Sequence, residues 1–222
     1  MPLFLHGLTI AGLNMPAYVL YTWVVMGIII GIALVVRGNL KMVPSGVANV
    51  VEAFIGGLKD FTITTMGPKG MDYFALIGTA AFFILFSNLI GIVPGFESPT
   101  ANINTTAACA IVVVATTHIV GVKSHGIGYI KHFLGPVWWL IPLMFFIEII
   151  GHVARLLSLS LRLFGNISGE DLLLALLLTL VPFLIPGIAI VHLLQTFTSF
   201  VQTFVFVLLT MLYISGAAEH AH

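Results

Sequence analysis

A stripe of charged and polar residues runs through an otherwise apolar stretch of this sequence. Arg155 and Arg162 follow Glu148 at intervals of seven and seven, and Asn166 and Glu170 follow at intervals of four and four. On a helix with about 100° per residue, Arg155 lies about 20° from Arg162. Glu148 and Asn166 each lie about 40° from the arginine, and Glu170 lies about 80° from it. The spacing therefore predicts one polar stripe along a single helix.

Arg162 has the clearest chemical consequence of these residues. An arginine at mid-membrane depth costs between about 2.5 and 17 kcal/mol, so it persists only beside protein, water or a counter-charge. No carboxylate stands three or four residues from Arg162, so we expect its counter-ion to come from another helix or another protein. A guanidinium does not deprotonate, but it favours the ionised form of a carboxylate beside it. Arg162 would act as a deprotonator and an electrostatic barrier.

The other members of the stripe have different interpretations. For Arg155 we favour a structural ion pair with Glu148, one period of seven away, or a position near the membrane surface. Asn166 and Glu170 could form the polar side of a water-filled path that reaches Arg162 from the outer surface.

A second polar stripe lies in the last apolar segment, without any charged residue. Its members stand at intervals of three, four and three: His192, Gln195, Ser199 and Gln202. Hydrogen bonding between helices alone could explain such a stripe. A path for protons or ions is the alternative interpretation.

The sequence offers little to a metal, a cofactor or a nucleic acid. Its one cysteine, Cys109, lies in an apolar run and is interpreted as a packing residue, and no spaced Cys/His set indicates a metal site. The eight basic residues balance the eight acidic ones, so no charge excess favours nucleic acid. We expect no metal, no cofactor and no nucleic-acid partner.

The composition identifies the elements that must position both stripes. Of the 222 residues, 59% are hydrophobic and 7% are charged, against about 25% charged in soluble domains. This excludes a water-soluble monomer. Because a bilayer core about 30 Å thick is crossed by about 20 apolar helical residues, we predict an all-α polytopic protein, one membrane domain over residues 1–222. The predicted spans are about 17–36, 73–93, 103–122, 138–181 and 188–214.

Two further elements follow from length and charge. At about 1.5 Å per residue, segment 138–181 would measure about 66 Å, so it must tilt strongly or break. Pro182 and Pro186 mark the turn into the last helix, and we expect the last two helices to be long and steeply tilted. Segment 42–66 is predicted as an amphipathic helix at the membrane surface, with a plain connecting loop as the alternative.

The basic residues of the loops predict the orientation of the chain. The polar loops 37–72 and 123–137 contain six of them, whereas the N-terminal tail and the turns 94–102 and 182–187 contain none. Those six are Arg37, Lys41, Lys59, Lys69, Lys123 and Lys131. The positive-inside rule then predicts cytoplasmic polar loops, an outer N-terminus and a cytoplasmic C-terminus.

One segment carries a family resemblance. Residues 158–166, Ser-Leu-Ser-Leu-Arg-Leu-Phe-Gly-Asn, followed by Gly169 and Glu170, closely resemble the signature of subunit a, or subunit 6, of the F-type ATP synthase membrane sector. The resemblance extends over nearly the whole chain beyond residue 70. Its further matches are residues 99–106, the loop 126–128, Glu148, and residues 202–206 with Leu209, Thr210 and Tyr213.

The resemblance implies a mechanism. In this family two water-filled half-channels meet at the arginine, which faces a rotating ring of c subunits that each carry one membrane carboxylate. By this resemblance Arg162 would keep that carboxylate ionised and block a direct proton leak. Asn166, Glu170 and Gln202 would line the outer half-channel or position the arginine, and Glu148 would belong to the inner side.

The resemblance also implies partners and a location. The chain would be a non-catalytic, proton-translocating subunit that works only in a complex with the c ring and b-type peripheral stalk subunits. It would lie in the bilayer of a bacterial plasma (inner) membrane.

The sequence departs from the family pattern at one position. Some family members have a histidine seven residues before the glutamine that matches Gln202, where this sequence has Gln195. His192 could replace that histidine as the titratable partner of Glu170, because positions 192 and 195 lie about 60° apart on a helix. A self-contained secondary transporter is the alternative function, but the internal repeat expected of one is not visible. A purely structural anchor would not need a polar stripe at mid-membrane depth.

Overall fold

A computed structural model describes residues 9–10, 13–14, 16–38, 46–93, 95–126, 141–180 and 185–219. The long helices are α1 (Ala17–Gly38), α2 (Val47–Met66), α3 (Phe74–Ile90), α4 (Ile103–His125), α6 (Ile141–Leu180) and α7 (Ile185–Glu219). Two short 3-10 helices, η1 (Pro68–Tyr73) and η2 (Pro99–Ala101), precede α3 and α4. The two-residue strands β1 (Thr9–Ile10) and β2 (Leu13–Asn14) pair antiparallel before α1.

The predicted all-α class is confirmed, and five helical segments are long and apolar enough to cross a membrane. They are Ala17–Gly38, Pro68–Ile90, Ile103–Ser124, Pro142–Leu180 and Gly187–Ala218. Of the two alternatives for the fourth span, the structure has no break between Ile141 and Leu180, because α6 is one helix of 40 residues. At 1.5 Å per residue α6 is about 60 Å long, twice the core of a bilayer. A steep tilt of α6 in the membrane stays a prediction.

Helix α2 covers most of the segment predicted to be amphipathic. Its polar residues Glu52, Lys59 and Asp60 are exposed, whereas Phe54 and Leu58 pack against a buried cluster formed by α3 and α7. The helix is therefore one-sided, which excludes the alternative of a plain loop for residues 47–66. Its location at a membrane surface stays a prediction.

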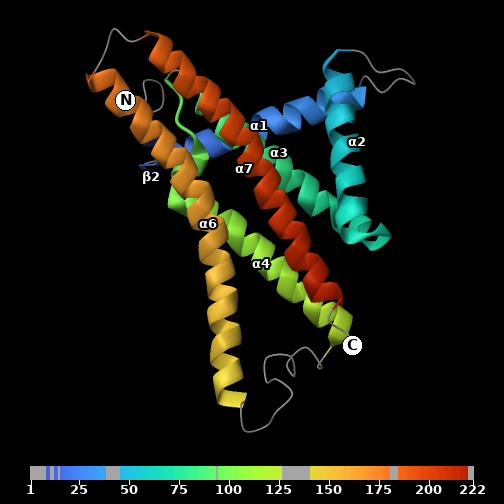
Figure 1. The fold of residues 1–222 in the computed structure, drawn as a ribbon. Coiled ribbons are helices and arrows are strands. Elements are labelled where there is room, and N and C mark those ends of the chain that lie inside the picture. The colour runs from blue at the N-terminus through green and yellow to red at the C-terminus, as the bar shows by residue number, and fades with distance from the viewer. Residues whose placement is uncertain are drawn as a thin grey trace.

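The core that positions the polar stripes lies where α3, α4, α6 and α7 meet (Figure 1). Its fully buried side chains come from all four helices: Ile84, Ala110, Val113, Leu159, Leu163, Ile167 and Phe206. Cys109 is partly buried and packs against the same cluster. This packing holds one face of α6 inside the protein and turns the opposite face outward.

A tight turn connects α3 to α4 and closes one end of this core. The Ser98 hydroxyl donates to the Ser87 carbonyl oxygen at 2.7 Å, and the Thr100 hydroxyl donates to Asn88 Oδ1 at 2.6 Å. A Cβ atom at Gly91 would lie 2.8 Å from Ser98 Cβ, so only glycine allows this approach. Helix α4 then begins with an N-cap, because the Asn102 side chain accepts a hydrogen bond from the backbone N–H of Asn104.

Candidate functional site

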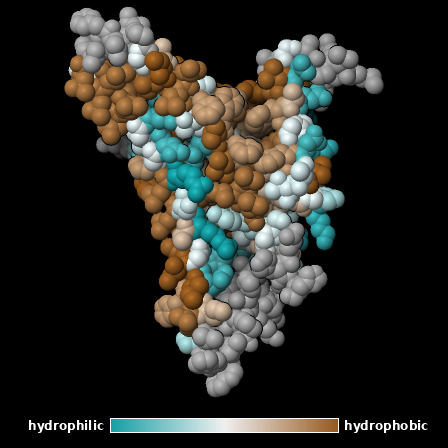
Figure 2. Space-filling model, viewed as in Figure 1, coloured by the Kyte–Doolittle hydropathy of each residue, from teal (hydrophilic) through white to brown (hydrophobic). Residues whose placement is uncertain are grey.

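Arg162 lies on the exposed face of α6, between buried residues of the core. Leu159, three residues before Arg162, and Leu163, directly after it, are 1% and 0% exposed, whereas Arg162 is exposed. Its Nη2 atom donates to the Ser158 hydroxyl at 3.2 Å. Among the residues that the structure describes, no carboxylate lies within ion-pair distance of Arg162. Figure 2 shows the band of hydrophilic side chains that follows α6 across a largely hydrophobic face.

Toward the C-terminal end of α6, the next polar contact joins α6 to α7. Asn166 Nδ2 donates to Gln202 Oε1 at 2.7 Å, and Gln202 is only 3% exposed. The two residues that the sequence placed on separate stripes thus meet across the helix interface. A buried amide with a partner of this kind keeps a fixed orientation, because losing the bond would leave a polar group in an apolar surrounding.

Further along the same helices, three polar side chains form a chain of hydrogen bonds. Gln195 Nε2 donates to Asp171 Oδ1 at 3.2 Å, and Gln195 Oε1 lies 3.0 Å from His192 Nδ1. Gln195 is 4% exposed and therefore links His192 to Asp171 inside the protein. His192 thus contacts Gln195, and its role as the titratable partner of Glu170 stays a prediction.

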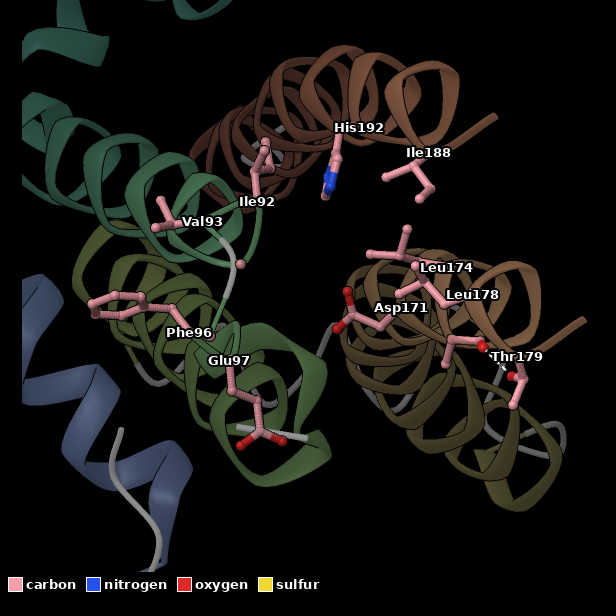
Figure 3. A pocket seen from close by; sticks show the side chains of 13 residues that line it. Ile92, Val93, Phe96, Glu97, Asp171, Leu174, Leu178, Thr179, Ile188 and His192 are labelled. Atoms are coloured by element: carbon pink, nitrogen blue, oxygen red, sulfur yellow. Dashed lines mark hydrogen bonds between the residues drawn. The ribbon is translucent and has the colours of Figure 1, made fainter. Parts of the chain in front are cut away.

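A cavity of about 700 Å³ opens beside this chain, between the turn after α3 and the upper parts of α6 and α7. Figure 3 shows Asp171 and His192 pointing into it from the two helices, with Glu97 contributed by the turn. Its remaining wall is mainly apolar, from residues such as Ile92 and Leu178. A space of this size holds a file of water molecules.

A second, very small cavity lies beside Asp171, between α6, α7 and the turn after α3. It offers about 10 Å³, the room of about one water molecule, and its lining includes Glu170, Ser199 and Asn88. The Ser199 hydroxyl is turned toward its own helix, where it donates to the Gln195 carbonyl oxygen at 2.7 Å. Asn88 Nδ2 is buried and has no partner among the described residues. This cavity lies between Asp171 and the Asn166–Gln202 contact in the order of the residues along both helices.

The polar residues near the beginning of α6 form a separate group. Glu148 pairs with His152, with 3.2 Å between Glu148 Oε1 and His152 Nε2. The guanidinium of Arg155 lies 5.5 Å from the centre of the Tyr213 ring. Among the described residues no ion pair joins Arg155 to Glu148: seven residues separate them by about 10.5 Å along the axis, whereas His152 stands one turn from Glu148. The alternative for Arg155, a position near the membrane surface, stays a prediction.

Three residues of these groups escaped the sequence analysis. Asp171 lies nine residues beyond Arg162, about 180° around the helix, and so falls outside the stripe. Asn88 and His152 lack any local pattern that separates them from ordinary core residues. In the described part of the chain, no group of three or more His, Cys, Asp or Glu side chains is arranged to hold a metal ion.

Known proteins match this chain over most of its length. Residues 19–215 match the family described as ATP synthase A chain. The chain is similar to ATP synthase subunit a of Citrifermentans bemidjiense, at 54% identity over 92% of this chain and 88% of that protein. It is equally similar to ATP synthase subunit a of Geobacter sulfurreducens, at 54% identity over 91% and 87% of the two chains. The subunit of Syntrophobacter fumaroxidans is 53% identical over 92% and 85%.

Proposed function

This chain belongs to the ATP synthase subunit a family and is a multi-pass component of that enzyme's membrane sector, and we propose that it conducts the protons that drive the rotor. The resemblance drawn from residues 158–170 is thereby confirmed. In the proposed mechanism, two half-channels load and unload the carboxylates of a rotating c-subunit ring, and Arg162 separates them. In this role the chain takes up and releases protons but does not itself make or hydrolyse ATP.

The exposed position of Arg162 carries the proposal. An arginine on an apolar outer face, without a carboxylate partner among the described residues, persists in a membrane only beside protein, water or a counter-charge. In this proposal another protein supplies the counter-charge. A ring carboxylate that reaches Arg162 is held ionised by the guanidinium, because a nearby positive charge favours the charged form. The ring then turns only after each carboxylate has given up its proton on one side and can regain one on the other.

We assign the outer half-channel to the cavity beside Asp171. Protons enter the large cavity, pass Asp171 with its partners Gln195 and His192, and continue through the small cavity toward Asn166 and Gln202. In this scheme Glu170 and Ser199 line the small cavity. Asn88 lies beside them, and its unpartnered Nδ2 can donate to a water there. The polar stripe of α7 thus serves the path as well as the contact between the helices.

The inner half-channel, in this proposal, opens at the opposite end of α6. Glu148 lies fourteen residues before Arg162, about 21 Å along the helix axis, whereas Asp171 lies about 13.5 Å beyond it. We propose that the loops rich in lysine and arginine face the cytoplasm of a bacterium, with the N-terminus outside and the C-terminus inside. The Asp171 cavity then faces the outer side of the plasma membrane.

Two partners complete the proposed assembly. The ring would contact the apolar face of α6 around Arg162, where Leu161 is 47% exposed. Peripheral stalk subunits of the b type would hold the chain against rotation of the ring. Such a chain has no activity alone and functions only in the complex.

A cross-linking experiment tests the ring contact. In a Cys109→Ala background, Leu161→Cys and Ile119→Cys each carry a photoactivated cross-linker in the complete ATP synthase. Ile119 is the matched control, because it is 65% exposed but lies on α4. We expect an adduct with the c subunit from position 161 and none from position 119. An adduct from 119 without one from 161 would contradict the assignment of the ring-facing surface.

A further inference from the structure

Two histidines from different helices meet near the beginning of α6. The ring centroids of His118 on α4 and His152 on α6 lie 4.5 Å apart, with 53° between the ring planes. His152 also lies 3.2 Å from the Glu148 carboxylate. The three side chains are partly exposed, since His152 and Glu148 retain 15% and 29% of their side-chain surface. We call these residues, His118, His152 and Glu148, the histidine cluster.

The charges around the cluster limit how many protons it can hold. Glu148 and Arg155 on α6 both interact electrostatically with the two imidazoles, and from α7 Tyr213 lies under the Arg155 guanidinium. Two imidazolium rings side by side would repel each other and Arg155, whereas one imidazolium is compensated by the Glu148 carboxylate. Repulsion therefore favours one proton over two on the histidine pair. Histidine is the side chain whose ordinary range allows proton exchange near neutral pH.

The histidine cluster lies at the end of α6 where the inner half-channel is proposed to open. His152 precedes Arg162 by ten residues, about 15 Å along α6, on the opposite side of the arginine from Asp171. Ser158, whose hydroxyl accepts a hydrogen bond from Arg162, also lies on this side. Helix α4 ends at His125, seven residues after His118, so the cluster lies within two turns of the end of its helix. Both histidines are thus close to the membrane face opposite the Asp171 cavity.

We propose that the histidine cluster is the proton-exchange site of the inner half-channel, a role that rests on the proposed function above. In the direction of ATP-driven pumping, water on the side of the soluble head gives a proton to an unprotonated ring nitrogen of the pair. The resulting imidazolium is stabilised by the Glu148 carboxylate until the proton passes along water to an ionised ring carboxylate on the same side of Arg162. The pair then returns to its neutral form. In the direction of ATP synthesis each proton takes the reverse course.

The experiment uses inverted membrane vesicles that contain the complete ATP synthase, because the soluble head then faces the medium. The initial rate of ATP-driven proton pumping, per assembled complex, is measured against the pH of the medium. The uncoupled ATPase rate at each pH corrects for the head itself. The variant is the double substitution His118→Gln and His152→Gln, and Glu148→Gln removes the carboxylate separately.

We expect both variants to lose pumping at a lower medium pH than the unchanged enzyme, by about one pH unit, the effect of removing one charged partner. At alkaline medium pH free protons are scarce, and an enzyme without the histidine pair has no side chain to collect them, so its pumping rate falls earlier. Added imidazole should restore the rate of the histidine variant, because the free base replaces the lost proton carrier. His192→Gln, on the Asp171 side, should show neither the shift with medium pH nor the rescue.

Two results would overturn the inference. One is an unchanged pH profile in the double glutamine variant. The other is an unchanged profile when both histidines are replaced by phenylalanine, which keeps the ring packing and removes the titration. Either result would leave the proposed function intact if Arg162→Ala still abolishes pumping. Pumping that survives Arg162→Ala would instead refute the proposed function itself.

Discussion

Asp171 on α6 accepts a hydrogen bond from Gln195 on α7 at 3.2 Å, and both line the small cavity beside Glu170 and Ser199. Because the Gln195 amide also contacts His192, the carboxylate is tied to a titratable ring on the neighbouring helix without touching it. The Gln195 amide can fix the orientation of both Asp171 and His192, but it does not itself release a proton at neutral pH. In the proposed path, proton exchange in this region therefore depends on Asp171 and on water that enters the two cavities.

Replacement of Asp171 by asparagine tests this dependence. The amide keeps the size and a hydrogen bond to Gln195 but cannot bind and release protons, so ATP-driven pumping should fall on the order of tenfold or more. Pumping is measured in inverted vesicles at equal amounts of assembled enzyme. Asp60→Asn on the exposed face of α2 is the matched control and should pump normally. Normal pumping by Asp171→Asn would exclude a proton path through this carboxylate.

The contact between Asn166 and Gln202 should behave as a coupled pair. Asn166→Leu and Gln202→Leu each break the 2.7 Å hydrogen bond and leave the remaining amide without this partner. Because the double variant leaves no such amide, its pumping defect should be smaller than the sum of the two single defects. A coupling of about 1 kcal/mol, about fivefold in rate, is the size measured for such bonds between membrane helices. Additive defects would show that the two residues act independently.

Gly91 should be essential to the turn that forms one wall of the cavity. In Gly91→Ala the new Cβ would lie 2.8 Å from Ser98 Cβ and 3.4 Å from the Ser98 backbone, so the turn must move. We expect a loss of about 1–3 kcal/mol in stability, seen as a lower thermal midpoint of the purified complex and weaker pumping.

Gly78→Ala, within helix α3 that precedes this turn, is the control for this change. Nothing lies within 4 Å of a Cβ atom at Gly78, and alanine is the better helix former by about 1 kcal/mol. This variant should be at least as stable as the unchanged protein. A Gly91→Ala complex of equal stability would show that the turn is more adaptable than its close contact indicates.

The sequence predicted the helices well because membrane spans follow from simple constraints. Charge-free windows of about 20 residues have few alternatives to a spanning helix, and the predicted span 103–122 begins at the same residue as α4. The Arg162 stripe followed from periodicity alone, and the buried residues Ser160 and Ile167 lie about 160° and 140° from Arg162, on the opposite face.

Contacts between helices could not be predicted in the same way. Asp171 points away from the Arg162 stripe, and only the packing of α7 and the turn after α3 brings it to the path. His118 and His152 are 34 residues apart on different helices, so no local spacing indicates that their rings meet. The expected ion pair of Arg155 and Glu148 is not found among the described residues for a related reason: a shared helix face does not make two side chains neighbours when a closer partner, His152, is available.

The role of Arg162 is tested most directly by proton movement in vesicles that contain Arg162→Ala. ATP-driven pumping is measured at equal assembly, and passive proton leak is measured after removal of the soluble head. Lys59→Ala, which removes an exposed cation from α2, is the control and should match the unchanged enzyme in both assays. We predict that Arg162→Ala abolishes pumping and raises the leak. Pumping at the normal rate with an unchanged leak would contradict the assignment of Arg162 as deprotonator and barrier.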